Sequence, residues 1–313
     1  MKCVGTDWSH MVSRRTFLAQ AAIAAIPLRA EGATRIVDTH THFYDPTRTQ
    51  GVPWPNREDE LLYRTVLPAE YRKLAEPHGV RGTVVVEASP WVEDNQWLLD
   101  LAAREPFILG IVGNLDPLAA DFAANFQRFA KNPKFRGIRV AGKQLAEHGT
   151  ETAYLDSIRR LADAGLSLDV SGASDYLAHI PAVSRAVPKI RIIVNHVGSA
   201  GNPTKIKQEW RDGIRAAAEN ERVFCKVSAL PEQSGLPVGK APTETAFYRP
   251  ILDTVWAAFG EKRVIFGSNW PVSENGTSFE NVMAIIRPFF AEKGAAAERQ
   301  YFEANAQDAY RWV

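Results

Sequence analysis

Two histidines stand one residue apart in the stretch RIVDTHTHFYD, which spans residues 35–45. The run is rich in apolar and β-branched residues and predicts a β-strand, in which alternate side chains point to the same face. Asp38, His40 and His42 are therefore expected to share one face. A core-facing strand ordinarily carries Val or Ile there, so two imidazoles predict metal binding or acid–base chemistry. Asp38 either orients a histidine or accepts hydrogen bonds from backbone amides.

A third imidazole and other polar side chains come at the ends of later apolar runs. These residues are Glu87, Arg139, His196, Lys226, Asn269 and Trp270. One histidine at a strand end is more often a hydrogen-bonded structural residue, whereas three that converge favour chemistry. The chain has no G-x-S-x-G, H-E-x-x-H or Walker motif, and its two cysteines are too few for a disulfide framework or a cysteine-based zinc site.

Eight apolar runs must position these side chains, and segments of helical periodicity lie between most of them. The runs are residues 35–43, 79–88, 107–115, 135–140, 166–172, 190–198, 223–230 and 263–270. Apolar strands without strict alternation are typical of a parallel sheet buried on both faces. We expect an α/β fold, a single-domain (β/α)8 TIM barrel, whose active site forms at the carboxyl ends of the strands. An open doubly wound sheet would need a glycine-rich loop after the first strand, and none is present.

The longest irregular segment, residues 45–60, follows the first predicted strand and would overhang the mouth of such a barrel. Its Trp54 is a candidate wall of the substrate pocket. Trp270, after the eighth strand, is a second candidate.

The amino-terminal residues have the order of a signal peptide. Arg14 and Arg15 precede an apolar run of about a dozen residues, too short for the roughly 20 that span a bilayer, and small residues end at Ala30. We expect residues 1–30 to be a twin-arginine signal and residues 31–313 to be the exported, periplasmic domain. The net charge is +1 and no basic stripe is visible, so nucleic acid is not an expected partner.

H-x-H on the first strand, H-x-G after the sixth and FGSNWPV on the eighth resemble the amidohydrolase superfamily. They are most similar to the amidohydrolase-related branch that contains sugar-acid lactonases and 2-pyrone-4,6-dicarboxylate hydrolases, over about residues 35–313. Two positions depart from the family pattern. Arg139 and Asp169 stand where binuclear members carry a lysine and a histidine, so a binuclear metal site is not expected. Asn269 stands where the family commonly has an aspartate that takes a proton from water.

The resemblance implies a hydrolase that opens a lactone or related ester of a small carboxylic or sugar acid. In this interpretation Arg139 and Lys226 bind the carboxylate of the substrate or polarise its carbonyl. His40, His42 and His196 either hold one divalent ion, with zinc favoured, or act without metal. Without a metal, His196 is the general base and Asn269 orients water, because an amide cannot accept a proton at neutral pH.

Two alternatives stay open at this point. A zinc-dependent decarboxylase of the same broad family would use the same three histidines. A non-catalytic exported binding protein would keep the barrel without its base. Metal analysis separates the first alternative from the main interpretation, and a panel of lactones separates the second.

Overall fold

The computed structural model describes residues 35–313, so the predicted signal peptide lies outside the described residues. Eight strands follow one another along the chain, and every one of the predicted apolar runs forms a strand. They are β1 (Ile36–Thr41), β2 (Val80–Val86), β3 (Ile108–Gly113), β4 (Phe135–Ala141), β5 (Ser167–Ser171), β6 (Arg191–Val194), β7 (Val223–Val227) and β8 (Val264–Phe266).

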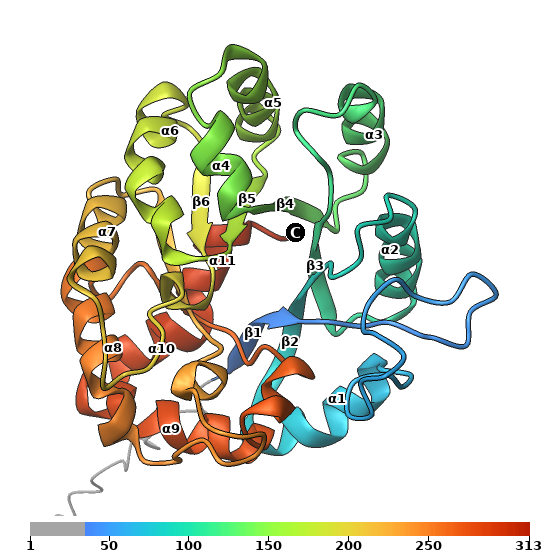
Figure 1. The fold of residues 1–313 in the computed structure, drawn as a ribbon. Coiled ribbons are helices and arrows are strands. Elements are labelled where there is room, and N and C mark those ends of the chain that lie inside the picture. The colour runs from blue at the N-terminus through green and yellow to red at the C-terminus, as the bar shows by residue number, and fades with distance from the viewer. Residues whose placement is uncertain (1–34) are drawn as a thin grey trace, which may run out of the picture. The chain divides into compact units, whose positions relative to one another are not determined.

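The strands form one parallel sheet in the order β1 to β8. Backbone hydrogen bonds then join the two edges, from Asn269 N to His40 O at 2.8 Å and from His42 N to Trp270 O at 2.9 Å. Because the sheet closes on itself, no edge strand is left unpaired. The expected (β/α)8 TIM barrel is confirmed (Figure 1).

Helices surround the sheet on the outside (Figure 1). They are α1 (Pro68–Ala75), α2 (Asp94–Arg104), α3 (Phe122–Phe129), α4 (Gly142–His148), α5 (Thr152–Asp163), α6 (Ile180–Ala186), α7 (Gln208–Ala218), α8 (Thr245–Phe259), α9 (Phe279–Glu292), α10 (Ala295–Arg299) and α11 (Asn305–Tyr310). Short 3-10 turns lie at η1 (Glu76–His78), η2 (Ser174–His179), η3 (His196–Gly198), η4 (Pro231–Ser234) and η5 (Val272–Asn275), and a π-helical turn, η6 (Gln300–Ala304), precedes α11. None of the helices in the described part of the chain is long and apolar enough to cross a membrane.

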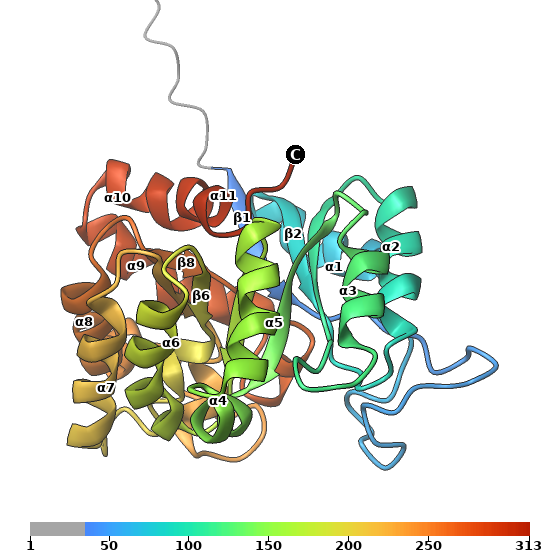
Figure 2. The same cartoon turned by 90° about the horizontal axis from the view of Figure 1, so that it is seen from above.

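The inside of the barrel has its own apolar cluster, separate from the larger core between sheet and helices. Its buried members are Val84, Val86, Val112, Ile193, Phe224, Ile265, Ala309 and Tyr310. The last two come from α11, which lies at the end of the barrel where the strands begin (Figure 2). This end is therefore filled with side chains, and a ligand can reach the barrel only from the other end.

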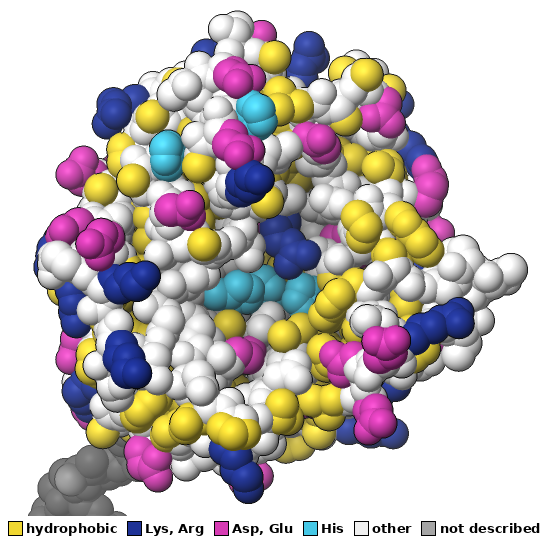
Figure 3. Space-filling model, in the orientation of Figure 1, with side chains coloured by type: hydrophobic (Ala, Val, Ile, Leu, Met, Phe, Trp, Pro, Cys, Tyr) yellow, Lys and Arg dark blue, Asp and Glu magenta, His cyan; other side chains and the backbone are white. Residues whose placement is uncertain are grey.

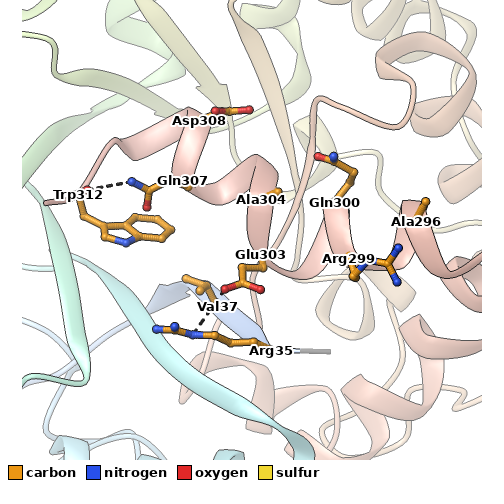
Figure 4. A pocket seen from close by; sticks show the side chains of 10 residues that line it. All are labelled: Arg35, Val37, Ala296, Arg299, Gln300, Glu303, Ala304, Gln307, Asp308 and Trp312. Atoms are coloured by element: carbon orange, nitrogen blue, oxygen red, sulfur yellow. Dashed lines mark hydrogen bonds and ion pairs between the residues drawn. The ribbon is translucent and has the colours of Figure 1, made fainter. Parts of the chain in front are cut away.

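Two further features define the ends of the barrel. A hollow of about 730 Å³ lies beside the start of β1, between Arg35, Val37 and the carboxyl-terminal helices, away from the histidines (Figure 4).

At the opposite end, the segment after β1 is tied to α2 by an ion pair of 2.8 Å between Arg48 and Asp94. That pair is almost fully buried, so the long loop has a fixed attachment beside the mouth.

Candidate functional site

The closure between β1 and β8 assembles the first part of the site. Asn269 N bonds to the carbonyl of His40, and Trp270 O accepts from the N–H of His42, so Asn269 lies alongside the H-x-H pair. A close approach is needed here, since a Cβ built on Gly267 would lie only 2.8 Å from the Cβ of His40. Only glycine therefore fits at this position of the strand.

Asp38 ties the same two strands together. Its carboxylate accepts from the backbone N–H of His40 at 3.0 Å, from Ser268 N at 2.9 Å and from the hydroxyl of Tyr71 at 2.5 Å. Burial raises the pKa of Asp38, although these hydrogen bonds oppose the shift. Of the two roles expected for this residue, the structure shows the contact with backbone amides.

The structure brings the three predicted histidines together. Ring centroids of His40 and His42 lie 5.0 Å apart, and those of His40 and His196 lie 4.4 Å apart. His196 reaches this position from a left-handed backbone conformation, with a φ of 52°, and Asn269 has a φ of 63°. Such conformations are uncommon for residues other than glycine and gather at functional sites. Figure 3 shows histidine side chains and a basic group in a depression on this face.

Lys226 lies beneath the imidazoles and is completely buried. Its Nζ is 3.0 Å from Oδ2 of Asp169 and 3.3 Å from Nδ1 of His40. Tyr310 also donates to that Asp169 oxygen, at 2.8 Å. The structure holds the charge of Lys226 inside the barrel against Asp169, and its contact with the substrate stays a prediction. Burial lowers the pKa of Lys226, and the adjacent Asp169 opposes that shift.

The ammonium of Lys226 fixes the protonation of His40. An ammonium has only donors, so Nδ1 of His40 must accept and a neutral ring then carries its proton on Nε2. Burial, with Lys226 next, keeps the pKa of His40 well below the ordinary value, so the ring is neutral at pH 7. Nε2 is buried and has no hydrogen-bond partner among residues 35–313. His40 thus offers an unused N–H donor.

His42 carries its proton on the other ring nitrogen. Its Nδ1 lies 2.7 Å from the carbonyl of Val86, which can only accept, so the proton is on Nδ1 and Nε2 has a lone pair. Burial lowers the pKa of His42 to about 3, and the ring is neutral. His196 is less constrained, because its Nδ1 contacts the hydroxyl of Ser228 at 2.9 Å and a hydroxyl donates or accepts. Burial and Lys226 also lower the pKa of His196.

Glu232 is a site residue that the sequence did not predict. It lies in η4, after β7, and Asn269 Nδ2 donates to its Oε1 at 2.7 Å. Its other oxygen, Oε2, is buried without a hydrogen-bond partner in the described chain. Burial raises the pKa of Glu232 to about 7. A single carboxylate in an irregular turn leaves no periodic pattern in the sequence. The one signal that could have found Glu232 is the position of PEQS just after the seventh strand.

Glu87 and Arg139 occupy another side of the mouth. Burial raises the pKa of Glu87 to about 7, while Arg139 and the backbone N–H of Ser89, which donates at 2.5 Å, oppose the shift. Arg139 is half-buried, and within residues 35–313 its guanidinium makes no hydrogen bond or ion pair. A guanidinium without a partner beside the imidazoles is available for an anionic or carbonyl oxygen.

The two tryptophans differ. Trp54 is half-buried and lies edge-on to His42 with ring centroids 5.8 Å apart, as expected for a pocket wall. Trp270 is fully buried, packs on Tyr71 at 5.1 Å and donates its indole N–H to Glu274. The interpretation of Trp270 as a pocket wall therefore disagrees with the structure, in which this residue belongs to the core under the mouth.

The donors do not fit the predicted single metal ion. A metal ligand needs a lone pair, whereas Nε2 of His40 carries a proton as long as Lys226 is an ammonium. Among residues 35–313, no three His, Cys, Asp or Glu side chains form a possible ligand set. The ligand set of His40, His42 and His196 is therefore not supported, and the chemistry below is derived from the side chains alone.

Comparison with known proteins agrees with this architecture. A family model described as amidohydrolase (Amidohydro_2) matches residues 37–312. An L-fucono-1,5-lactonase of Burkholderia ambifaria is 30% identical over 283 residues, covering 88% of this chain and 95% of that one. A second, of Burkholderia multivorans, is 26% identical and covers 86% of this chain and 92% of its own.

A crystal structure of an amidohydrolase from Burkholderia multivorans with bound zinc has a TM-score of 0.77 at 24% identity. It covers 89% of this chain and is itself covered completely. At this identity the likeness is one of fold. From the match over almost the whole barrel, the chain belongs to the amidohydrolase family.

Proposed function

We propose that this protein hydrolyses a lactone of a small carboxylic or sugar acid. Two lactonases are among its relatives, at 30% and 26% identity over most of the chain. The observation that carries the proposal is the opposite polarity of two adjacent neutral imidazoles. His40 offers an N–H donor and His42 offers a lone pair, with ring centroids 5.0 Å apart.

Lactone hydrolysis uses one hydrogen-bond donor and one acceptor that face the same carbonyl group. Water attacks the carbonyl carbon, and the oxyanion that forms is stabilised by a donor such as Nε2–H of His40. Nε2 of His42 accepts a hydrogen bond from the water. The bond from the carbonyl carbon to the ring oxygen then breaks, and that oxygen takes a proton, so one lactone and one water give one hydroxy acid. His196 remains our proposal for the general base, and Asn269 orients the water.

Arg139 gives the site its preference for acids. Its guanidinium is free of protein partners, so it can bind both oxygens of a carboxylate on the substrate. Trp54 forms the neighbouring apolar wall beside His42. A small acidic lactone that places its carbonyl over His40 and its carboxylate at Arg139 is the ligand that this arrangement favours.

We propose that hydrolysis does not depend on a metal, because Lys226 supplies the fixed cation beside His40. A zinc-dependent decarboxylase would need Nε2 of His40 as a ligand, and that nitrogen carries a proton as long as Lys226 is an ammonium. Purified protein should keep its lactonase activity after treatment with a strong chelator. Loss of activity that only zinc restores would contradict the metal-independent mechanism.

The substrate class is tested with two groups of lactones on protein made without residues 1–30. One group carries only hydroxyl groups, such as L-fucono-1,5-lactone, and the other carries a free carboxylate. Hydrolysis is followed by acid release above the buffer rate. We expect hydrolysis in both groups, with a lower KM for carboxylated lactones. A chain inactive on every member would favour a binding protein.

Export remains a proposal that the Arg14–Arg15 pair supports. Replacing both arginines by lysine should leave the protein in the cytoplasm with its leader attached. Unchanged export and cleavage of that variant would exclude the twin-arginine route.

A further inference from the structure

The amide of Asn269 lies between a carboxylate and an imidazole. On one side its Nδ2 donates to Oε1 of Glu232 at 2.7 Å. On the other side Asn269 lies close enough to His42 to be among the groups that raise the pKa of that ring. Backbone hydrogen bonds on β1 hold Asn269 in place. The backbone of Asn269 is therefore fixed beside β1, and its amide can still change orientation.

The ionisation of Glu232 decides that orientation. An ionised carboxylate only accepts, so the amide must turn Nδ2 toward it and Oδ1 away from it, toward a water beside His42. Oδ1 and the lone pair on Nε2 of His42 both accept, so they bond to that water and not to each other. A protonated carboxyl can also donate, and its proton can bond to Oδ1 of an amide turned by 180°. Oε2 of Glu232 has no partner in the described chain, so no other contact opposes this exchange.

We propose that Glu232 is a positioning residue whose ionised carboxylate holds the Asn269 amide with Oδ1 facing the attacking water. In that orientation Oδ1 and Nε2 of His42 share one hydrogen of the water, and the other hydrogen is free for His196, the proposed general base. In the turned orientation an N–H of Asn269 faces the water and donates to a lone pair of its oxygen. That lone pair then no longer points at the carbonyl carbon. The catalytic consequence rests on the proposed hydrolysis, whereas the contact between Glu232 and Asn269 does not.

Among the described residues, no cation contributes to the shift in the pKa of Glu232. Burial raises its pKa to about 7, and hydrogen bonds from Asn269 and from a backbone N–H oppose the shift. Titratable groups on neighbouring elements include Tyr248 and Glu244 at α8, Glu274 in η5 and His196 in η3, whose carbonyl accepts from Gln233 beside Glu232. Glu274 is already bound by Arg64 at 3.0 Å. Glu232 should therefore titrate in the neutral range.

The direction of the pH effect follows from which form of Glu232 is active. Glu232 must be ionised, so kcat should fall as the pH drops below about 7. In Glu232→Gln, the neutral amide can accept or donate and holds neither orientation of Asn269. We expect kcat at pH 8 to fall roughly 5- to 10-fold, because a charged hydrogen bond becomes a neutral one. The acid limb near 7 should disappear.

The matched control is Glu219→Gln, an exposed carboxylate at the end of α7. It should leave kcat and the acid limb unchanged. If Glu232→Gln keeps both the rate and the limb of the wild-type protein, Glu232 does not position Asn269.

A charge exchange tests the pairing itself. Asn269→Asp alone places two carboxylates at the 2.7 Å contact, where they must share a proton, and kcat should fall by about 10-fold or more. Adding Glu232→Gln restores one donor and one acceptor, so the double variant should recover much of this loss. A double variant no better than Asn269→Asp, or a single variant more active than wild type, would overturn the proposal.

A titration that needs no substrate separates this inference from the proposed function. The side-chain carboxyl carbons of glutamate are labelled with 13C, and the Glu232 signal is assigned by its absence in Glu232→Gln. Its pKa should be near 7 and should rise in Asn269→Ala, because that change removes a hydrogen bond to the ionised form. A pKa near 4.5 that Asn269→Ala leaves unchanged excludes the contact, whether or not any lactone is hydrolysed.

Discussion

Two layers of polar side chains inside the barrel differ in how fully they are paired. The floor consists of Asp38, Asp169 and Lys226, and each is completely buried with its charge paired or hydrogen-bonded. The rim consists of Glu87, Arg139, Glu232 and Asn269. There, Arg139 has no partner within residues 35–313 and Glu232 leaves one oxygen unpaired.

This difference separates stability from chemistry. The floor lies beneath the imidazoles, where it sets the local charge and so decides which nitrogen of His40 carries the proton. The rim contains groups whose pKa is near 7 or whose hydrogen bonds are unused, which are the properties of residues that act on a ligand. Changes in the floor should therefore lower the free energy of unfolding, and changes in the rim should alter kinetics.

The largest effect is expected from breaking the floor. Lys226→Met leaves Asp169 buried without its counterion, and such a loss costs about 3–5 kcal/mol in the free energy of unfolding. Urea denaturation measures it. The control is Lys143→Met, which breaks an exposed pair with Glu147 and should cost about 0.5 kcal/mol or less. Equal losses in the two variants would show that the floor has no special role in stability.

The next effect is on the donor at the boundary of the two layers. His40→Ala removes the N–H proposed to stabilise the oxyanion, and loss of one such donor typically lowers kcat by about 10²–10³-fold. KM should change much less. A variant in which only KM changes would place His40 in substrate binding instead.

Arg139→Met sharpens the comparison within the rim. The guanidinium is proposed to bind a carboxylate, so KM for a carboxylated lactone should rise by roughly 10- to 100-fold, as for the loss of a charged hydrogen bond. KM for a lactone with only hydroxyl groups should remain close to that of the wild-type protein. The thermal midpoint should hardly move, because Arg139 has no protein partner to lose. A large fall in stability would identify it as a structural residue.

The smallest effect is expected from Trp54, the proposed wall of the substrate pocket. Trp54→Phe keeps an aromatic ring beside His42 and should change KM by less than about 5-fold, whereas Trp54→Ala should raise it further. Steady-state kinetics with one acidic lactone are sufficient. Identical KM values in the two variants would remove Trp54 from the pocket.

The sequence predicted those parts of the site that depend on local periodicity. The shared face of His40 and His42 follows from the alternation of one strand, and the order of the eight strands follows from their apolar runs. The pairing of Lys226 with Asp169 could not be predicted, because it joins β7 to β5 across the barrel interior. The sequence also does not show how deeply a side chain lies in the barrel. Lys226 and Trp270 were expected at the mouth but lie under it. Glu232 was missed because η4 has no periodic pattern.

The proposed mechanism depends most directly on the tautomers of two histidines. Long-range 1H–15N correlation spectra at pH 7, assigned with His40→Ala and His42→Ala, report which ring nitrogen carries the proton in each residue. We predict a protonated Nε2 in His40 and a protonated Nδ1 in His42, with both rings neutral. A proton on Nδ1 of His40, or a cationic ring in either residue, would contradict the proposed role of Lys226 and the mechanism built on it.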